Sequence, residues 1–271
     1  MAEPQQAPRE TYLQFTMMRL RRSMEEVYQI TIFGLRFFKY VFTPPYEWAQ
    51  VRKHLDDLGA KSIPLLTVVG LIMGLILALQ SRPTLDRFGA GAFLPAMLAL
   101  TIVREMGPVI TALIVAGRVS SGIGAEVGSM KVTEQIDALE VSAVDPFNYL
   151  VVTRVLACII MLPLLTAYVD FLAISGGYLA EWIASNSSMQ LYFTEVIQSL
   201  KFYDLLPGVG KTLAFGYIIG VIGAYQGFNT SRGTEGVGRA ATSAVVLASL
   251  NIIFLDLVII QLTFLFFGTG T

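Results

Sequence analysis

The chain has 271 residues, a mean hydropathy of +0.63, 54% hydrophobic residues and only 14% charged residues. Soluble domains usually have about a quarter of their residues charged, so this composition excludes an ordinary soluble protein and indicates an integral membrane protein with several helices. The formal net charge of −1 excludes nothing, because the distribution of charge along a membrane protein matters more than its sum.

The N-terminal region is polar at first and then mixed. Residues 1–10 are polar and contain proline, so we expect a disordered tail and no cleavable signal peptide. Residues 11–61 intersperse Arg and Lys among large apolar residues, and the apolar stretch Val27–Leu35 is too short to cross a bilayer. We therefore predict a helix lying in the membrane interface, ended by Pro44, and then a short polar helix over 46–58.

Residues 62–271 form the predicted membrane domain, an all-α bundle of five spanning helices. The spans are expected at about residues 63–80, 93–117, 149–182, 212–224 and 243–267. The first contains Gly70 and Gly74 in the GxxxG spacing that suits close helix contact. The fourth has small-residue faces at Gly216, Gly220 and Gly223, and we expect a flexible Gly-rich loop over 225–239.

The distribution of positive charge predicts the orientation. Fourteen of the 19 Lys and Arg residues lie in segments that are cytoplasmic if the N-terminus is cytoplasmic. The segments on the outer side then hold only Arg82, Arg87, Lys201 and Lys211. With five spans, the C-terminus is expected on the opposite, periplasmic side.

The second predicted span contains a charged pair, Arg104 and Glu105, about 16 Å along the helix from Phe93 and so near the bilayer centre. Each charge costs at least about 2.5 kcal/mol in a spanning helix. Neighbouring helix residues point about 100° apart, so each side chain needs a partner on another helix, a water-filled cavity or a polar ligand. Asp170 and Asp256 are available acids.

Two interpretations of the pair stay open. It could belong to a structural polar network that fixes helix packing. It could also line a cavity that meets a polar or phosphate-bearing head group, because Arg suits bidentate phosphate contact. Gly107-Pro108, directly after the pair, predicts a kink or break in the helix.

The polar segment 126–140 predicts one amphipathic helix between the second and third spans. At about 100° per residue, one sector of about 120° holds the acidic side chains Glu126, Glu134, Asp137 and Glu140. The opposite side holds Val132, Ile136 and Leu139. The helix could be a solvated surface helix or a coupling helix set into a groove on a cytoplasmic motor.

The sequence does not support an enzymatic or nucleotide-binding motif. Residues 208–212 read GVGKT, but the first glycine position of a phosphate-binding loop is occupied by Leu205, and no strand precedes it. His54 is alone in a charged segment, so we expect no metal site, and Cys158 is expected as a small core residue. We therefore expect a transport subunit rather than an enzyme, with no cofactor and no nucleic-acid partner.

Two stretches resemble the MlaE/YrbE permease family, the membrane subunits of MCE-type lipid ABC transporters. They are EMGPVITALIVAGRVSSGIGAEVGSMKVTEQIDALEVSAVDPFNYLVVTRVLA (105–157) and GAYQGFNTSRGTEGVGRAATSAVVLASL (223–250). The resemblance implies an inner-membrane homodimer that moves glycerophospholipid to or from a periplasmic hexamer of MCE-domain proteins and maintains outer-membrane lipid asymmetry. It also implies two cytoplasmic ATPase subunits, which carry ATP and Mg²⁺, and a STAS-domain protein.

The resemblance also implies site residues. Lipid contact falls on Arg104, Glu105, Leu75, Ile76 and Leu79. Coupling to the ATPase falls on Glu126, Lys131, Glu134, Gln135, Asp137 and Glu140.

Two rival functions are weighed beside this one. A permease could carry another amphiphile, such as a sterol-like compound or an organic toxin. A membrane scaffold could use the acidic helix only to recruit a cytoplasmic protein, and it would not need Arg104 or Glu105.

Overall fold

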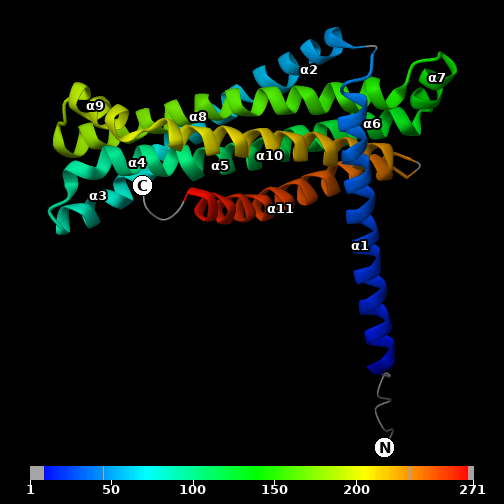
Figure 1. Ribbon diagram of the computed structural model, residues 1–271, viewed down its shortest axis with the longest axis horizontal. Coiled ribbons are helices and arrows are strands. Elements are labelled where there is room, and N and C mark those ends of the chain that lie inside the picture. The colour runs from blue at the N-terminus through cyan, green and yellow to red at the C-terminus, as the bar shows by residue number, and fades with distance from the viewer. Residues whose placement is uncertain (1–8, 45, 232, 268–271) are drawn as a thin grey trace, which may run out of the picture. The chain divides into compact units, whose positions relative to one another are not determined.

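A computed structural model describes residues 9–44, 46–231 and 233–267 of the chain (Figure 1). Regular structure in these ranges is helical, with no strand. The chain divides into two compact units, residues 1–44 and 45–271. Five helices of the second unit are long and apolar enough to cross a membrane, which confirms the predicted all-α membrane fold.

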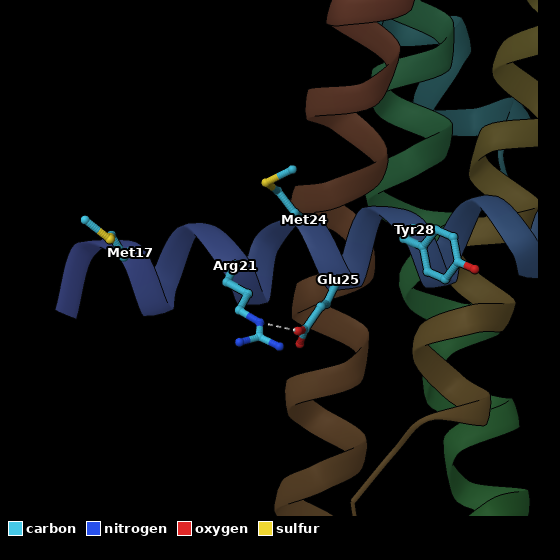
Figure 2. Close-up of a pocket in the computed structure, with 5 residues that line it drawn as sticks. All are labelled: Met17, Arg21, Met24, Glu25 and Tyr28. Atoms are coloured by element: carbon cyan, nitrogen blue, oxygen red, sulfur yellow. Dashed lines mark hydrogen bonds and ion pairs between the residues drawn. The ribbon is translucent and has the colours of Figure 1, made fainter. Parts of the chain in front are cut away.

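The first unit consists of one helix, α1 (Arg9–Tyr40). The predicted disordered tail falls mainly on residues 1–8, outside the described residues, while residues 9–10 are helical. Figure 2 shows Met17, Arg21, Met24, Glu25 and Tyr28 around a shallow hollow of this helix, where Arg21 Nε donates to Glu25 Oε1 at 3.0 Å. Both charged side chains are exposed, so solvent screens the pair and it contributes little stability.

The second unit begins with α2 (Trp48–Ala60), which packs against α8. Helices α3 (Ile63–Arg87), α8 (Thr153–Ser185, preceded by the π-helical η4, Phe147–Val152), α10 (Phe202–Phe228) and α11 (Thr234–Phe267) are four of the spans. The remaining span is a continuous helical run over 91–132, made of η1 (Gly91–Phe93), α4 (Leu94–Thr101), η2 (Ile102–Met106), α5 (Gly107–Val115), η3 (Ala116–Ser120) and α6 (Ser121–Val132). Two short helices, α7 (Gln135–Val141) and α9 (Met189–Ser199), lie between spans.

The helix run over 91–132 does not break at Pro108. Instead, the residues before it form the π-helical turn η2, and Pro108 occupies the first turn of α5, where a helix tolerates proline. In place of the predicted kink, the helix widens locally at η2. This widened turn carries the charged pair Arg104 and Glu105.

The second span continues to Val132 rather than ending near Gly117, and the fourth span also differs from its predicted bounds. The fourth span begins at Phe202 rather than Thr212 and ends at Phe228, and only residues 229–233 separate it from α11. The predicted loop over 225–239 was therefore too long. The early start was missed because Asp204 and Lys211 made the segment look extramembrane, although both side chains are buried in the bundle.

Close approach at glycine joins α3 to α8. A Cβ atom added to Gly74 would lie 1.7 Å from the carbonyl oxygen of Ala173, and one on Gly176 would lie 2.2 Å from that of Leu71. Gly70 also faces α8. The GxxxG pair is thus a close helix contact, as predicted, and it brings two backbones together where apolar side chains alone could not hold helices in lipid.

Glycine also seats α10 in the bundle. Gly216 and Gly220 meet the α8 backbone at Cys158 and Val155, and Gly223 meets Ser120 at the end of η3 and Ile123 on α6. Helix α10 therefore packs against both α8 and α6 (Figure 1). This placement fixes which of its polar residues face the second span.

Adding one methyl group at Gly74 should destabilise the bundle. We expect Gly74→Ala to cost about 1–3 kcal/mol of unfolding free energy, because the methyl must push apart two helix backbones. Gly122→Ala is the matched control, since a Cβ there meets no atom within 4 Å. Thermal unfolding in detergent checks this, and equal melting temperatures for both variants would contradict a rigid α3–α8 contact.

Candidate functional site

Five charged side chains meet inside the bundle, and we call them the charged network. Arg104 Nε donates to Asp204 Oδ1 at 2.6 Å, and its Nη2 reaches the same oxygen. Lys211 Nζ donates to Glu105 Oε2 at 2.5 Å and lies 3.0 Å from Asp256 Oδ1 as an ion pair without hydrogen-bond geometry. The network thus joins η2, α10 and α11.

Helix geometry explains why these side chains converge. Asp204 and Lys211 are seven residues apart, so they lie on one side of α10, two turns from each other. Adjacent residues Arg104 and Glu105 diverge along η2, and each reaches one of them. Pro108 has no N–H to offer the Arg104 carbonyl four residues earlier, and Lys211 Nζ donates to that oxygen at 3.3 Å.

Burial is uneven across the network. The side chains of Asp204 and Lys211 are 3% and 2% exposed, whereas those of Arg104 and Glu105 are 47% and 41% exposed. Two cations face three carboxylates, so the ionised network carries one negative charge in excess. The α10 side of the network is therefore dry, and the η2 side is open to a ligand or to solvent.

The structure decides among the partners considered for the charged pair. Asp256 is in the network, but its ion partner is Lys211 rather than Arg104. Asp170 makes no described ion pair and lies against Gly107. Sequence reasoning missed Asp204 and Lys211, and the available signal was their two-turn spacing. Within the GVGKT stretch, Lys211 lies in the interior of α10, so this stretch is helical and is no phosphate-binding loop.

The apolar residues predicted for acyl chains lie on α3. Ile76 and Leu79 are exposed, and Leu75 is half-buried, while Gly74 and Ala78 between them pack inward. These side chains lie on the outward side of the bundle. Their contact with a lipid substrate stays a prediction.

The segment predicted as one helix over 126–140 is two helices, which corrects that prediction. Helix α6 ends at Val132, and α7 begins at Gln135 after Glu134, whose φ of +59° is left-handed. A non-glycine residue in this region costs about 1–2 kcal/mol, so the packing of buried Ile136 must compensate for the turn.

The predicted coupling residues are therefore divided between two settings. Lys131 Nζ binds Asp137 Oδ1 at 3.1 Å across the turn. Three others are exposed on or beside α7: Glu134, Gln135 and Glu140. Glu126 instead faces α8, where it accepts from Arg154 Nη2 at 2.8 Å.

Arg154 is the centre of a second charged group, formed with the exposed Glu126 on α6 and the buried His54 on α2. Its side chain is buried, and its Nη1 donates to the Leu150 carbonyl at 2.9 Å. Burial, and then the positive charge of Arg154, lower the pKa of His54 to about 4. His54 is therefore neutral at physiological pH. The group brings α2, α6 and α8 together, and its one ionised pair is Arg154 with Glu126.

Comparison with known proteins places the chain among membrane transport subunits. A model of the family described as Permease MlaE matches residues 51–262. A probable ABC transporter permease protein of Rickettsia typhi is 38% identical over 233 residues, which cover 86% of this chain and 90% of the relative. The intermembrane phospholipid transport system permease protein MlaE of Haemophilus influenzae is 36% identical over 232 residues, covering 82% and 87%. The chloroplastic protein TRIGALACTOSYLDIACYLGLYCEROL 1 of Arabidopsis thaliana is 33% identical over 223 residues, covering 82% and 63%.

Removing the buried cation of the charged network should destabilise the fold strongly. We expect Lys211→Met to cost about 3–5 kcal/mol of unfolding free energy, because Glu105 and Asp256 would keep their charges without a cation. The triple variant Lys211→Met/Glu105→Gln/Asp256→Asn should recover most of this loss. Thermal unfolding compares them, and a triple variant no more stable than the single one would show that charge is not the cause.

The neutral His54 should make stability depend on pH. Its folded pKa of about 4 lies below the ordinary 6.5, so the unfolded chain binds more protons between these values. As pH falls from 6.5 to 4, the wild type should lose about 2 kcal/mol more unfolding free energy than His54→Gln. Melting temperatures measured across this range test the difference, and parallel curves for the two proteins would contradict it.

Proposed function

The chain belongs to the MlaE family of ABC transporter permeases, and we propose that it moves glycerophospholipid between the inner membrane and a periplasmic MCE-domain protein. The name of the Haemophilus influenzae relative describes intermembrane phospholipid transport, which supports this substrate class. The observation that carries the proposal is the half-exposed Arg104 guanidinium inside a membrane-spanning helix.

Arg104 has donors to spare for a ligand. Its Nε and Nη2 both address one oxygen, Asp204 Oδ1, and a guanidinium has five N–H donors. A lipid phosphate offers several acceptor oxygens, and the planar guanidinium of arginine can bind two of them at once. We propose that the phosphate approaches Arg104 from its exposed side, with acyl chains along Leu75, Ile76 and Leu79. Glu105, which accepts a hydrogen bond from Lys211, marks the edge of the surface that the phosphate can approach.

The energy for transport would come from a partner. We propose two ATPase subunits, which carry ATP and Mg²⁺ and bind a STAS-domain protein, docked on the exposed acidic residues of α7 on the cytoplasmic side. This orientation puts the N-terminus in the cytoplasm and the C-terminus in the periplasm. The permease would act as a homodimer beneath an MCE hexamer, so that outer-membrane lipid asymmetry is maintained.

The helical run over 91–132 offers a mechanical path between the two sites. It carries Arg104 and Glu105 in η2 and Glu126 in α6, and α7 follows after a two-residue turn. A displacement of α7 would therefore move the continuous helical run over 91–132, which contains the η2 part of the charged network. Nucleotide binding on the partner could then change lipid affinity by favouring one arrangement of this helix.

Opposite effects of two variants test lipid binding at Arg104. Arg104→Gln should reduce co-purified phospholipid about tenfold, because the phosphate loses its cation, about 1.4 kcal/mol. Asp204→Asn should retain or increase it, because the guanidinium loses its competing carboxylate. Mass spectrometry of lipid bound to purified wild type and variants measures both.

The alternatives make different predictions in the same experiment. If Arg104 only holds helices together, the two variants should lose lipid and stability in parallel. Recovery of another amphiphile in place of phospholipid would point to a different cargo. Equal annular lipid in all three proteins would favour a scaffold and overturn the proposal.

A further inference from the structure

Three buried oxygens outside the charged network have no hydrogen-bond partner among the described residues. They are Thr111 Oγ1 on α5 and Thr166 Oγ1 and Asp170 Oδ1 on α8. The two threonines are 0% and 4% exposed. A buried polar group without a partner is costly in water-free surroundings, so three in one region need an explanation.

Helix positions place the three oxygens on neighbouring turns where α5 packs against α8. A Cβ added to Gly107 would lie 1.7 Å from Asp170 Oδ1, so the carboxyl group rests on the α5 backbone. Thr111 follows Gly107 by one helical turn, and Thr166 precedes Asp170 by one turn. Consecutive spans run in opposite directions, so both threonines are displaced from the Gly107–Asp170 contact in the same direction, by one turn or about 6 Å along the helix axis.

The threonine hydroxyls are not used by their own helices. Elsewhere in the chain, Thr67, Thr101 and Thr153 donate to the carbonyl four residues earlier, at 2.7–2.8 Å. Thr111 and Thr166 make no such bond in the structure. Their hydroxyls are therefore available to a group bound between the helices.

Among the described residues, no cation forms an ion pair with Asp170. The charged groups on the packed elements include Arg104 and Glu105 in η2, Asp204 and Lys211 in α10 and Asp256 in α11, and these bind one another. Helices α4 and α5 contain no charged residue.

The charged groups of the other packed elements lie far along the bundle. The charged residues of α3 lie in its last two turns, where Arg82 binds Glu181 of α8. Glu181 lies about 16 Å along α8 from Asp170. The charged residues of α2 surround His54 beside Arg154, about 24 Å in the other direction, and α9 carries only Glu195.

The number of oxygens decides which ligand fits. Divalent cations take six or more oxygen ligands, but only three side-chain oxygens gather here. A proton needs one carboxylate oxygen, and a buried water typically makes about three hydrogen bonds to otherwise unsatisfied groups. We propose that Asp170 binds a proton and that one water joins its carboxyl group to the hydroxyls of Thr111 and Thr166.

The proton adds to the carboxylate of Asp170, and no other bond changes. The site is independent of the proposed lipid transport, because it lies at the α5–α8 contact and involves no member of the charged network. Loss of the proton would leave a charge against the Gly107 backbone, so the α5–α8 contact should depend on it.

Infrared spectroscopy of the full-length protein tests the site directly. At neutral pH, the wild type should show the carbonyl-stretch band of a protonated carboxylic acid, which shifts in heavy water. The band should be absent from Asp170→Asn and present in the control Asp86→Asn, whose carboxylate is exposed. Thr111→Val/Thr166→Val should keep the band and move it to higher frequency, because the carboxyl group loses its hydrogen-bonded water.

Three results would overturn the proposal. One is the absence of an Asp170-dependent acid band, and another is a band that the threonine replacements leave unchanged. The last is a rise in melting temperature with NaCl or KCl that Asp170→Asn removes, which would assign an alkali cation. Should Asp170→Asn not fold, the frequency shift in the threonine variant decides, because that protein retains Asp170.

Discussion

Lys211 is the point at which the membrane domain is tied together. Its ammonium group is buried between the carboxylates of Glu105 and Asp256 and also donates to the Arg104 carbonyl. One side chain thereby links three of the five spans. In lipid, where apolar contact between helices has no hydrophobic driving force, such a buried ionic link can set which helices are neighbours. It also holds Glu105, while the half-exposed Arg104 keeps N–H donors that Asp204 does not use.

Backbone geometry prepares this link. The π-helical turn η2 rotates the charged pair toward α10, and the glycines of α10 let that helix approach α8 and α6 closely enough for Lys211 to be enclosed. Gly74 and Gly176 do the same for α3 and α8. Because these contacts join backbone to backbone, they have no long side chains that could absorb a displacement.

Two regions of the run over 91–132, η2 and α6, have different electrostatic character. At η2, the charges are partly open and one negative charge is in excess. At α6, Glu126 is matched by the buried Arg154, and α7 presents further acids to the outside. This division suits a subunit that receives force at one end and handles a charged head group at the other, which is the proposed division of work between the ATPase partner and the lipid path.

The sequence by itself determined the membrane class, the five spans, the close contact at Gly70 and Gly74, and the need of Arg104 and Glu105 for polar partners. Hydropathy, GxxxG spacing and the cost of charge in lipid are local properties, so they can be derived without coordinates. The partners of the charged pair were decided by the tertiary structure, because Asp204 lies 100 residues from Arg104 and Lys211 lies 106 from Glu105. The same holds for the early start of α10, where ion pairing across helices offsets the polarity that suggested a loop. The turn at Glu134 was also decided by packing, because the next helix buries Ile136. The turn contains no glycine, so the sequence carries no signal for a left-handed residue there.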